Sequence, residues 1–164
     1  SLADEIRGQE RDTSIRVVDD LFFGQLVRYL TRHRPSGLAP LQRIGHASGT
    51  WAALWSSIRD LKDAGVDPAA ATQGVTEGYF GQDERDKLQA LFSLYAAVEE
   101  VGTTFGLGTD DDFAESLIPF VPSAPFLASL THLFYYGFYD LTQVQLSLLE
   151  AVRATVQTTL FFAL

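Results

Sequence analysis

Cysteine and methionine are both absent from this chain of 164 residues. Without cysteine, the chain has no disulfide bond, no thiolate nucleophile and no metal site with a sulfur ligand. A chain of this length can bury roughly two thirds of the surface that its unfolded form exposes. One hydrophobic core is therefore enough to hold it without cross-links.

Positive charge is also scarce, and the formal net charge is −9 at pH 7. Of the 12 basic residues only Arg153 lies after residue 87, whereas 8 of the 21 acidic residues lie there. An acidic chain repels the phosphate backbone of nucleic acids. We therefore expect no nucleic-acid partner.

The first residues, SLADEIRGQERDTS, are too polar and too acidic for a secretory or organellar targeting peptide. We expect residues 1–13 to form an N-terminal arm and residues 14–164 to form a single helical domain. An intracellular location is favoured. It would be either the cytosolic face of endomembranes or an organelle after removal of a presequence.

Apolar residues recur at helical spacing in four segments, which are residues 14–33, 38–64, 82–102 and 140–154. The small residues of 68–81 allow one more short helix. The last segment, TVQTTLFFAL, is ambiguous, because its β-branched and aromatic residues suit a strand and its position suits a helix end. The predicted fold is mainly α-helical, with four to six helices in a single compact domain and a possible short β element near the C-terminus.

Small residues four positions apart, Gly45, Gly49 and Ala53, lie within the second predicted helix. On a helix they would share one face and let another backbone approach closely. Residues 103–116 form the clearest predicted loop, in which Thr109 or Asp110 can cap the element that follows.

Residues with catalytic or metal-binding chemistry form no recognisable pattern. His33, His46 and His132 lie far apart and match no zinc-binding spacing. The segment GHASG places Ser48 fourth, whereas a nucleophile elbow needs serine third. The acids of TDDDFAE lack the alternation of a calcium loop. We therefore expect no enzyme activity, no cofactor and no metal.

A run of 23 uncharged residues extends from Leu117 to Tyr139. Three prolines interrupt its first part, and the rest is about 21 Å long as a helix, short of a membrane core of roughly 30 Å. We predict an extended connector, LIPFVPSAP, and then a helix that buries Leu127, Leu130, Phe134 and Phe138. Peripheral contact with a membrane stays open.

Aromatic residues make up 12% of the chain and crowd into the same run. One helix face cannot bury all of them, so some are expected to contact a partner protein or a bound apolar molecule such as a lipid or pigment. The predicted contact residues are Trp51, Trp55, Phe134, Tyr135, Tyr136 and Tyr139.

The segments LFFGQLVRYL and LQRIGHASGTWAALW resemble the paired N-terminal helices of the small subunits of the transport protein particle (TRAPP) family. EGYFGQDERDKLQ is similar to a segment of some members, and LIPFVP, YYGFYDL and AVRATVQTT follow the family's closing segments. The resemblance covers residues 14–60 and 117–160. It implies a non-enzymatic α+β subunit that dimerises through helices, builds a vesicle-tethering complex and helps to activate a small GTPase.

The expected function is therefore that of a helical interaction subunit in a larger, oligomeric assembly. Two alternatives stay open. One is an accessory subunit of an organellar membrane-associated complex, and the other is a module that binds an apolar ligand between helices, lined by Trp51, Trp55, Phe134 and Tyr135.

Overall fold

The computed structural model describes residues 15–34, 37–44, 47, 49–136 and 141–161. The described residues are 72% helical, which confirms the mainly α-helical fold class. The chain divides into two compact units, each of which is described by itself. We call Val18–Leu107 the helical unit, and residues 15–17 with 108–161 the C-terminal unit. The predicted arm, residues 1–13, lies outside the described residues.

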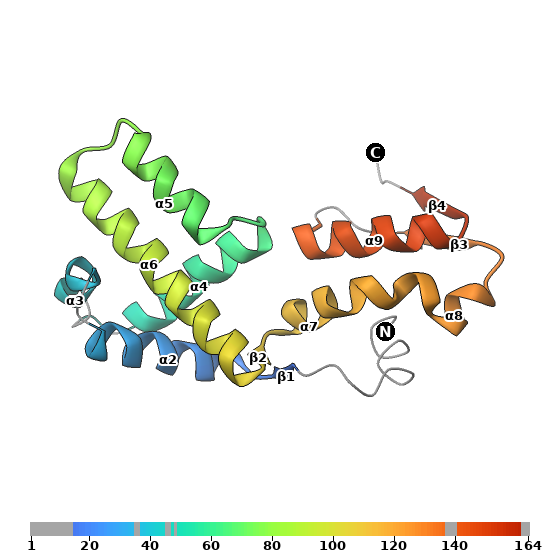
Figure 1. Ribbon diagram of the computed structural model, residues 1–164, viewed down its shortest axis with the longest axis horizontal. Coiled ribbons are helices and arrows are strands. Elements are labelled where there is room, and N and C mark those ends of the chain that lie inside the picture. The colour runs from blue at the N-terminus through green and yellow to red at the C-terminus, as the bar shows by residue number, and fades with distance from the viewer. Residues whose placement is uncertain (1–14, 35–36, 45–46, 48, 137–140, 162–164) are drawn as a thin grey trace. The chain divides into compact units, whose positions relative to one another are not determined.

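The described residues of the helical unit form the helices α2 to α6 (Figure 1). They are α2 (Asp20–His33), α3 (Ala39–Ile44), α4 (Thr50–Asp63), α5 (Pro68–Glu77) and α6 (Gln82–Phe105). The short strand β1 (Arg16–Val17) belongs to the C-terminal unit, and the short strand β2 (Leu107–Gly108) spans the boundary between the units in the sequence. Asp19 caps α2 by accepting a hydrogen bond from the Phe22 amide at 2.9 Å. Asp67 caps α5, which has Pro68 in its first turn, where the missing amide costs nothing.

The core of the helical unit is formed by apolar side chains from α2, α3, α4 and α6. The buried members are Phe23, Val27, Leu30, Leu38, Leu41, Leu54, Trp55, Ile58, Ala90, Leu94, Tyr95, Ala97 and Val98. Thr31 is the one buried polar residue among those described, and its hydroxyl donates to the Val27 carbonyl at 2.8 Å. That bond satisfies the hydroxyl within the helix.

The prediction of one continuous helix over residues 38–64 is wrong, because the segment divides into α3 and α4. Gly49 precedes α4 with a φ of 83°, a left-handed conformation that glycine adopts without steric cost. The Thr50 hydroxyl donates to the Ala47 carbonyl at 2.9 Å and closes the turn. Gly49 and Ala53 therefore share no helix face, and Ala53 is exposed. Gly45 lies outside the described residues.

The C-terminal unit contains shorter elements. They are α7 (Asp110–Leu117), the 3₁₀-helix η1 (Ile118–Ser123), α8 (Pro125–Ala128), β3 (Leu133–Tyr136), α9 (Gln143–Thr155) and β4 (Thr158–Phe161). A separate core joins α7, η1, α8 and α9, with the buried residues Phe113, Leu117, Val121, Ala124, Leu127, Val152 and Val156. No helix of the described residues has the length and apolar character needed to cross a membrane.

Three expectations for this unit are wrong. The predicted loop is partly helical, since α6 continues to Phe105 and α7 begins at Asp110. The predicted extended connector is mostly helical: Pro119 and Pro125 lie in the first turns of η1 and α8, where a missing amide costs nothing, and Pro122 lies inside the short η1. The helix predicted from Phe126 ends at Ala128, and Leu133–Tyr136 is a strand. The ambiguous C-terminal segment is a strand at Thr158–Phe161, which confirms the possible β element.

Thr109 caps α7, as the sequence predicted. Its hydroxyl accepts from the Asp112 amide at 3.2 Å, and the Asp112 carboxylate accepts from the Thr109 amide at 2.8 Å. Each bond satisfies an amide that has no partner within the helix. We expect Thr109→Ala to lower the free energy of unfolding by about 1 kcal/mol in urea denaturation. Thr109→Ser keeps the hydroxyl and should lose less, and an equal loss in both variants would contradict the capping role.

Candidate interaction face

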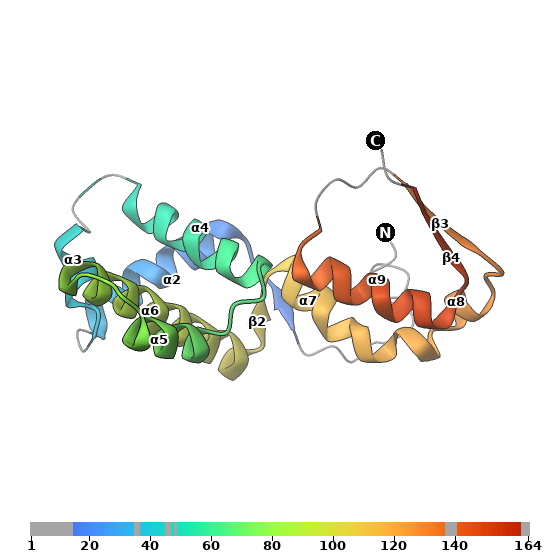
Figure 2. The same ribbon diagram turned by 90° about the horizontal axis from the view of Figure 1, so that it is seen from above.

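Strands β3 and β4 form a parallel two-stranded ladder (Figure 2). Phe134 pairs with Thr159, and Tyr136 pairs with Phe161. Side chains alternate between the two faces of a strand, so these four residues share one face. We call Phe134, Tyr136, Thr159 and Phe161 the outer face. Leu133, Tyr135, Thr158 and Leu160 form the inner face.

The three aromatic side chains of the outer face are exposed and lie close to one another. Phe134, Tyr136 and Phe161 are 65%, 81% and 45% exposed. The ring centroid of Phe161 lies 6.2 Å from that of Phe134 and 6.4 Å from that of Tyr136. Both distances fall within the range of centroid separations at which aromatic rings form favourable pairs. The outer face is therefore a continuous apolar surface in contact with solvent.

His132 borders this face and fixes one end of it. Its ring stacks on Phe134, with centroids 4.5 Å apart, and a hydrogen bond of 2.8 Å joins its Nε2 to the Thr159 hydroxyl. The side chain thus links residues on both strands. His132 therefore has an aromatic neighbour and one hydrogen-bond partner, which is an ordinary structural setting for a histidine.

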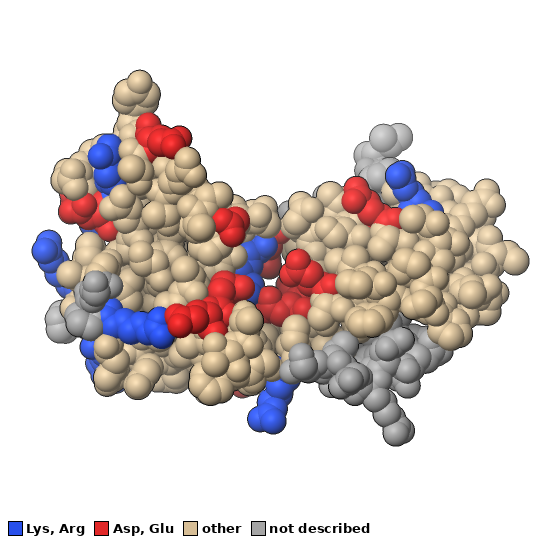
Figure 3. Space-filling model, viewed as in Figure 1, with Lys and Arg blue, Asp and Glu red and all other residues tan. Residues whose placement is uncertain are grey.

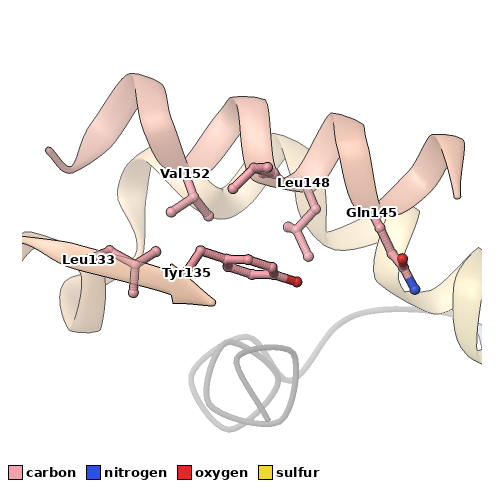
Figure 4. A pocket seen from close by; sticks show the side chains of 6 residues that line it. Leu133, Tyr135, Gln145, Leu148 and Val152 are labelled. Atoms are coloured by element: carbon pink, nitrogen blue, oxygen red, sulfur yellow. The ribbon is translucent and has the colours of Figure 1, made fainter. Parts of the chain in front are cut away.

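The inner face packs against α9. Figure 4 shows Tyr135 beneath α9, with Leu133 and Val152 near one end of the ring and Leu148 and Gln145 toward the other. These residues and Leu149 line a cavity of about 70 Å³. Tyr135 is 37% exposed, less than either neighbour on the strand. The ladder therefore has one face covered by a helix.

The cavity is small for a ligand site. Pockets for small molecules and cofactors are on the order of 300–1,000 Å³. An enclosed apolar cavity of about 150 Å³ accommodates benzene. A volume of about 70 Å³ suits a side chain or a few ordered waters better than a lipid or pigment.

No protein-family model matches this chain, and no curated protein sequence matches it significantly. The site must therefore be interpreted from its own geometry.

The predicted contact residues fall into different environments. Trp55 is 3% exposed and belongs to the core, and Trp51 is partly buried against the same core. Both lie in the helical unit, whereas Phe134 and Tyr135 lie in the C-terminal unit. Within either unit, the described residues bring no more than two of the four proposed ligand-lining side chains together.

Phe134 and Tyr136 lie on the outer face, as a contact role requires, and Tyr135 lies on the inner face. Tyr139 lies outside the described residues. Phe161 was missed as a site residue, because its place beside Tyr136 depends on pairing between segments 25 positions apart. The two adjacent phenylalanines at positions 161 and 162 are a signal that the sequence offers. The sequence does not show that this segment pairs with residues 133–136.

Charge is concentrated away from the ladder. In the C-terminal unit the described acids are Asp110, Asp111, Asp112 and Glu115 on α7 and Glu150 on α9. Neither β3 nor β4 contains a charged residue. Figure 3 shows a broad uncharged area over this unit. The outer face is therefore suited to apolar contact rather than to binding an ion.

In the helical unit, Arg34 and Glu100 form an exposed ion pair at 2.6 Å. The hydrogen bond from Arg34, and then its charge, lower the pKa of Glu100. The stabilisation from this pair is present above the unfolded-state pKa of the carboxyl and is lost as the pH falls through the folded-state value. Because both groups are exposed, solvent screens the interaction, and the pair contributes little to stability.

No group of three His, Cys, Asp or Glu side chains in the described part of the chain could hold a metal ion. His33 stacks on Tyr29, and its Nδ1 lies 2.9 Å from the Tyr29 carbonyl oxygen. His46 and Ser48 lie outside the described residues. What the geometry offers is an apolar aromatic face beside backbone strands.

Proposed function

We propose that this chain is a non-enzymatic interaction subunit that binds another polypeptide across the outer face of β3 and β4. The observation that carries the proposal is the cluster of Phe134, Tyr136 and Phe161, three adjacent rings that are 45–81% exposed. A contiguous patch of exposed apolar side chains is typical of a protein contact site.

The architecture of the ladder supports this proposal. Parallel strands are normally covered on both faces, and two strands alone are marginally stable in water. Here α9 covers the inner face, whereas Phe134, Tyr136 and Phe161 on the outer face stay 65%, 81% and 45% exposed. A partner that buried the three rings would remove this apolar area from water and complete the second layer.

Phenylalanine and tyrosine suit this role energetically. They bury a large area with few rotatable bonds, so a contact gains apolar burial at a small entropic cost. Aromatic residues are enriched at the centres of protein interfaces, where charged residues are depleted. The uncharged composition of both strands fits this pattern.

The resemblance of residues 14–60 and 117–160 to TRAPP small subunits makes a vesicle-tethering complex the specific assembly that we propose. The partner would then be another subunit of that complex, and the complex would help to activate a small GTPase. This extension rests on the resemblance alone, whereas the contact face rests on the exposed rings.

The test is affinity purification of the tagged chain from its native source, compared with the variant Phe134→Ser, Tyr136→Ser, Phe161→Ser. We expect the proteins retained by the unchanged chain to fall at least tenfold with the triple variant, as quantified by mass spectrometry. The loss corresponds to about 1.4 kcal/mol of binding free energy, below what a single hot-spot residue often contributes.

The matched control is Phe105→Ser, which removes a ring that is 70% exposed in the helical unit. Circular dichroism should show unchanged helix content in both variants. Sedimentation of the purified chain then shows whether the bound polypeptide is a second copy. If the triple variant retains the same proteins in the same amounts as the control, the proposed function is wrong.

A further inference from the structure

The turn between α5 and α6 carries the most exposed large hydrophobic side chain of the described residues. Its sequence is Gly78, Tyr79, Phe80 and Gly81. The Tyr79 side chain is 108% exposed relative to an extended reference, whereas that of Phe80 is 37% exposed. The turn joins two antiparallel helices that pack closely along their length (Figure 1). Tyr79 therefore stands at the tip of a helical hairpin.

The turn is packed from within. Phe80 folds back over Gly78, so that a Cβ added at Gly78 would lie 2.5 Å from Phe80 Cε2 and 3.0 Å from the Gly74 carbonyl oxygen. Only glycine leaves room for that ring. Arg85 lies behind the turn, where its Nη2 donates to the Gly78 carbonyl at 3.3 Å and its Nε is buried without a hydrogen-bond partner. These contacts hold the Phe80 ring against the turn, whereas the Tyr79 ring stays exposed to solvent.

Acidic side chains surround the tip. Glu77 ends α5, and Asp83 and Glu84 lie in the first turn of α6. All three are exposed. Asp86 is also exposed, so four acids outnumber the two nearby cations, Arg85 and Lys87, and the local charge is negative.

We propose that Tyr79 is an anchor that inserts into an apolar pocket of a partner protein, and that lysine or arginine residues border this pocket. A central aromatic residue with a polar surround is the usual form of an interface hot spot. The acids at the rim favour a cationic partner surface and speed its approach. The same acids oppose insertion into an anionic membrane.

The packing of the turn adds to the expected affinity. A side chain presented by a preformed turn loses less conformational entropy on binding than one on a flexible loop. This contact goes beyond the proposed function, because it uses the helical unit. The outer face of the C-terminal unit can fail its test without affecting this one.

The first experiment places the photo-crosslinking residue benzoylphenylalanine at position 79 of the full chain in its native cells. We expect a crosslink to one protein, with a yield that falls when Glu77→Gln and Glu84→Gln are combined and when the salt concentration is raised. Mass spectrometry identifies the crosslinked protein. The same probe at position 105, at the other end of α6, should not capture it.

The identified protein is then purified, and its dissociation constant is measured with the unchanged chain and with Tyr79→Ala. We expect binding to weaken by about 30-fold, because that is the scale of a hot-spot residue. Gly78→Ala should also weaken binding by displacing Phe80, whereas Phe105→Ala should leave it unchanged. Tyr79→Ala alters no buried contact, so the fold is retained.

Three results would overturn the proposal. One is a crosslink that forms only with other copies of this chain. Another is Tyr79-dependent sedimentation with phosphatidylcholine vesicles and no crosslinked protein, which would assign the tip to a lipid surface. The third is a dissociation constant for Tyr79→Ala within twofold of the unchanged chain.

Discussion

Trp55→Ala should lower the free energy of unfolding of the helical unit by about 3–5 kcal/mol, the usual loss when a buried tryptophan is truncated to alanine. Trp55 is 3% exposed, and its ring stacks on Phe23 with centroids 4.3 Å apart and planes 12° apart. Its Nε1 also donates to Asp20 Oδ1 at 2.7 Å. Truncation removes the stacking, leaves a cavity between α2 and α4 and breaks this hydrogen bond.

The loss can be divided between packing and hydrogen bonding. Trp55→Phe keeps an aromatic ring beside Phe23 and loses the indole donor, so it should cost less than Trp55→Ala. Asp20 remains paired with Arg59 at 2.7 Å in both variants, so its carboxylate is not left alone. The difference between the two variants then measures the packing of the ring.

Urea denaturation followed by fluorescence measures these losses, because Trp51 remains as the one tryptophan and packs against the same core. Leu21→Ala, at a residue that is 71% exposed on α2, is the matched control and should change stability by no more than about 0.5 kcal/mol. A loss below about 1 kcal/mol for Trp55→Ala would contradict the core role of Trp55 and favour its predicted role as a contact residue.

The helices α2, α6 and α9 were predictable from the sequence, but the faces that they bury were only partly so. On α2 the apolar residues at helical spacing include Leu30, which is buried, but also Phe22 and Tyr29, which are 38% and 58% exposed. Phe23 and Val27 are buried as well, so the period was right but did not identify every buried residue. Two adjacent phenylalanines give no local signal for which one turns inward, and the stacking partner Trp55 lies on another helix.

The division between α3 and α4 shows a second limit. Glycine is compatible with close helix packing and with a left-handed turn, and its spacing alone does not distinguish them. The hydrogen bond from Thr50 to the Ala47 carbonyl favours the turn. The Thr109 cap, by contrast, was predictable, because capping depends on residues three positions apart.

The candidate site was only half predictable. Composition located the aromatic excess at residues 134–136, but the run was assigned to a helix, in which Phe134 would be buried. Its conformation is set by β4, beginning with the hydrogen bond from the Leu133 amide to the Gln157 carbonyl at 2.9 Å. Phenylalanine and tyrosine are common in strands, but the non-local pairing that fixes this strand leaves no trace in periodicity. The outer face therefore becomes visible only when the two strands are placed together.

The outer face depends on the core behind it, and Leu127→Ala tests that dependence. Leu127 is fully buried in the core that joins η1, α8 and α9. Its truncation should cost about 2–5 kcal/mol. A unit of this size is expected to have a total stability of only about 3–8 kcal/mol. The substitution therefore removes a large share of what holds the C-terminal unit together.

Hydrogen exchange with mass spectrometry resolves the effect by segment. We expect Leu127→Ala to accelerate exchange of the α9 amides strongly and to leave α4 and α6 protected, since opening free energies differ between separately packed regions. Leu146→Ala is the matched control. Leu146 lies on α9 and is 40% exposed, so its truncation should change the exchange rates little. Equal acceleration in α4 and α6 would contradict the assignment of Leu127 to a separate core.

Leu127→Ala also distinguishes the core that supports the outer face from the contacts that the outer rings make with a partner. Leu133 and Tyr135 of β3 pack beside Leu148 and Val152 of α9, so loosening α9 should also displace the rings on the opposite side of the strand. Leu127→Ala should thus reduce partner retention and increase exchange together. The triple substitution of the rings should reduce retention with exchange unchanged, because exposed side chains contribute little to stability. Loss of retention without faster exchange in Leu127→Ala would show that the partner contacts more than the outer face.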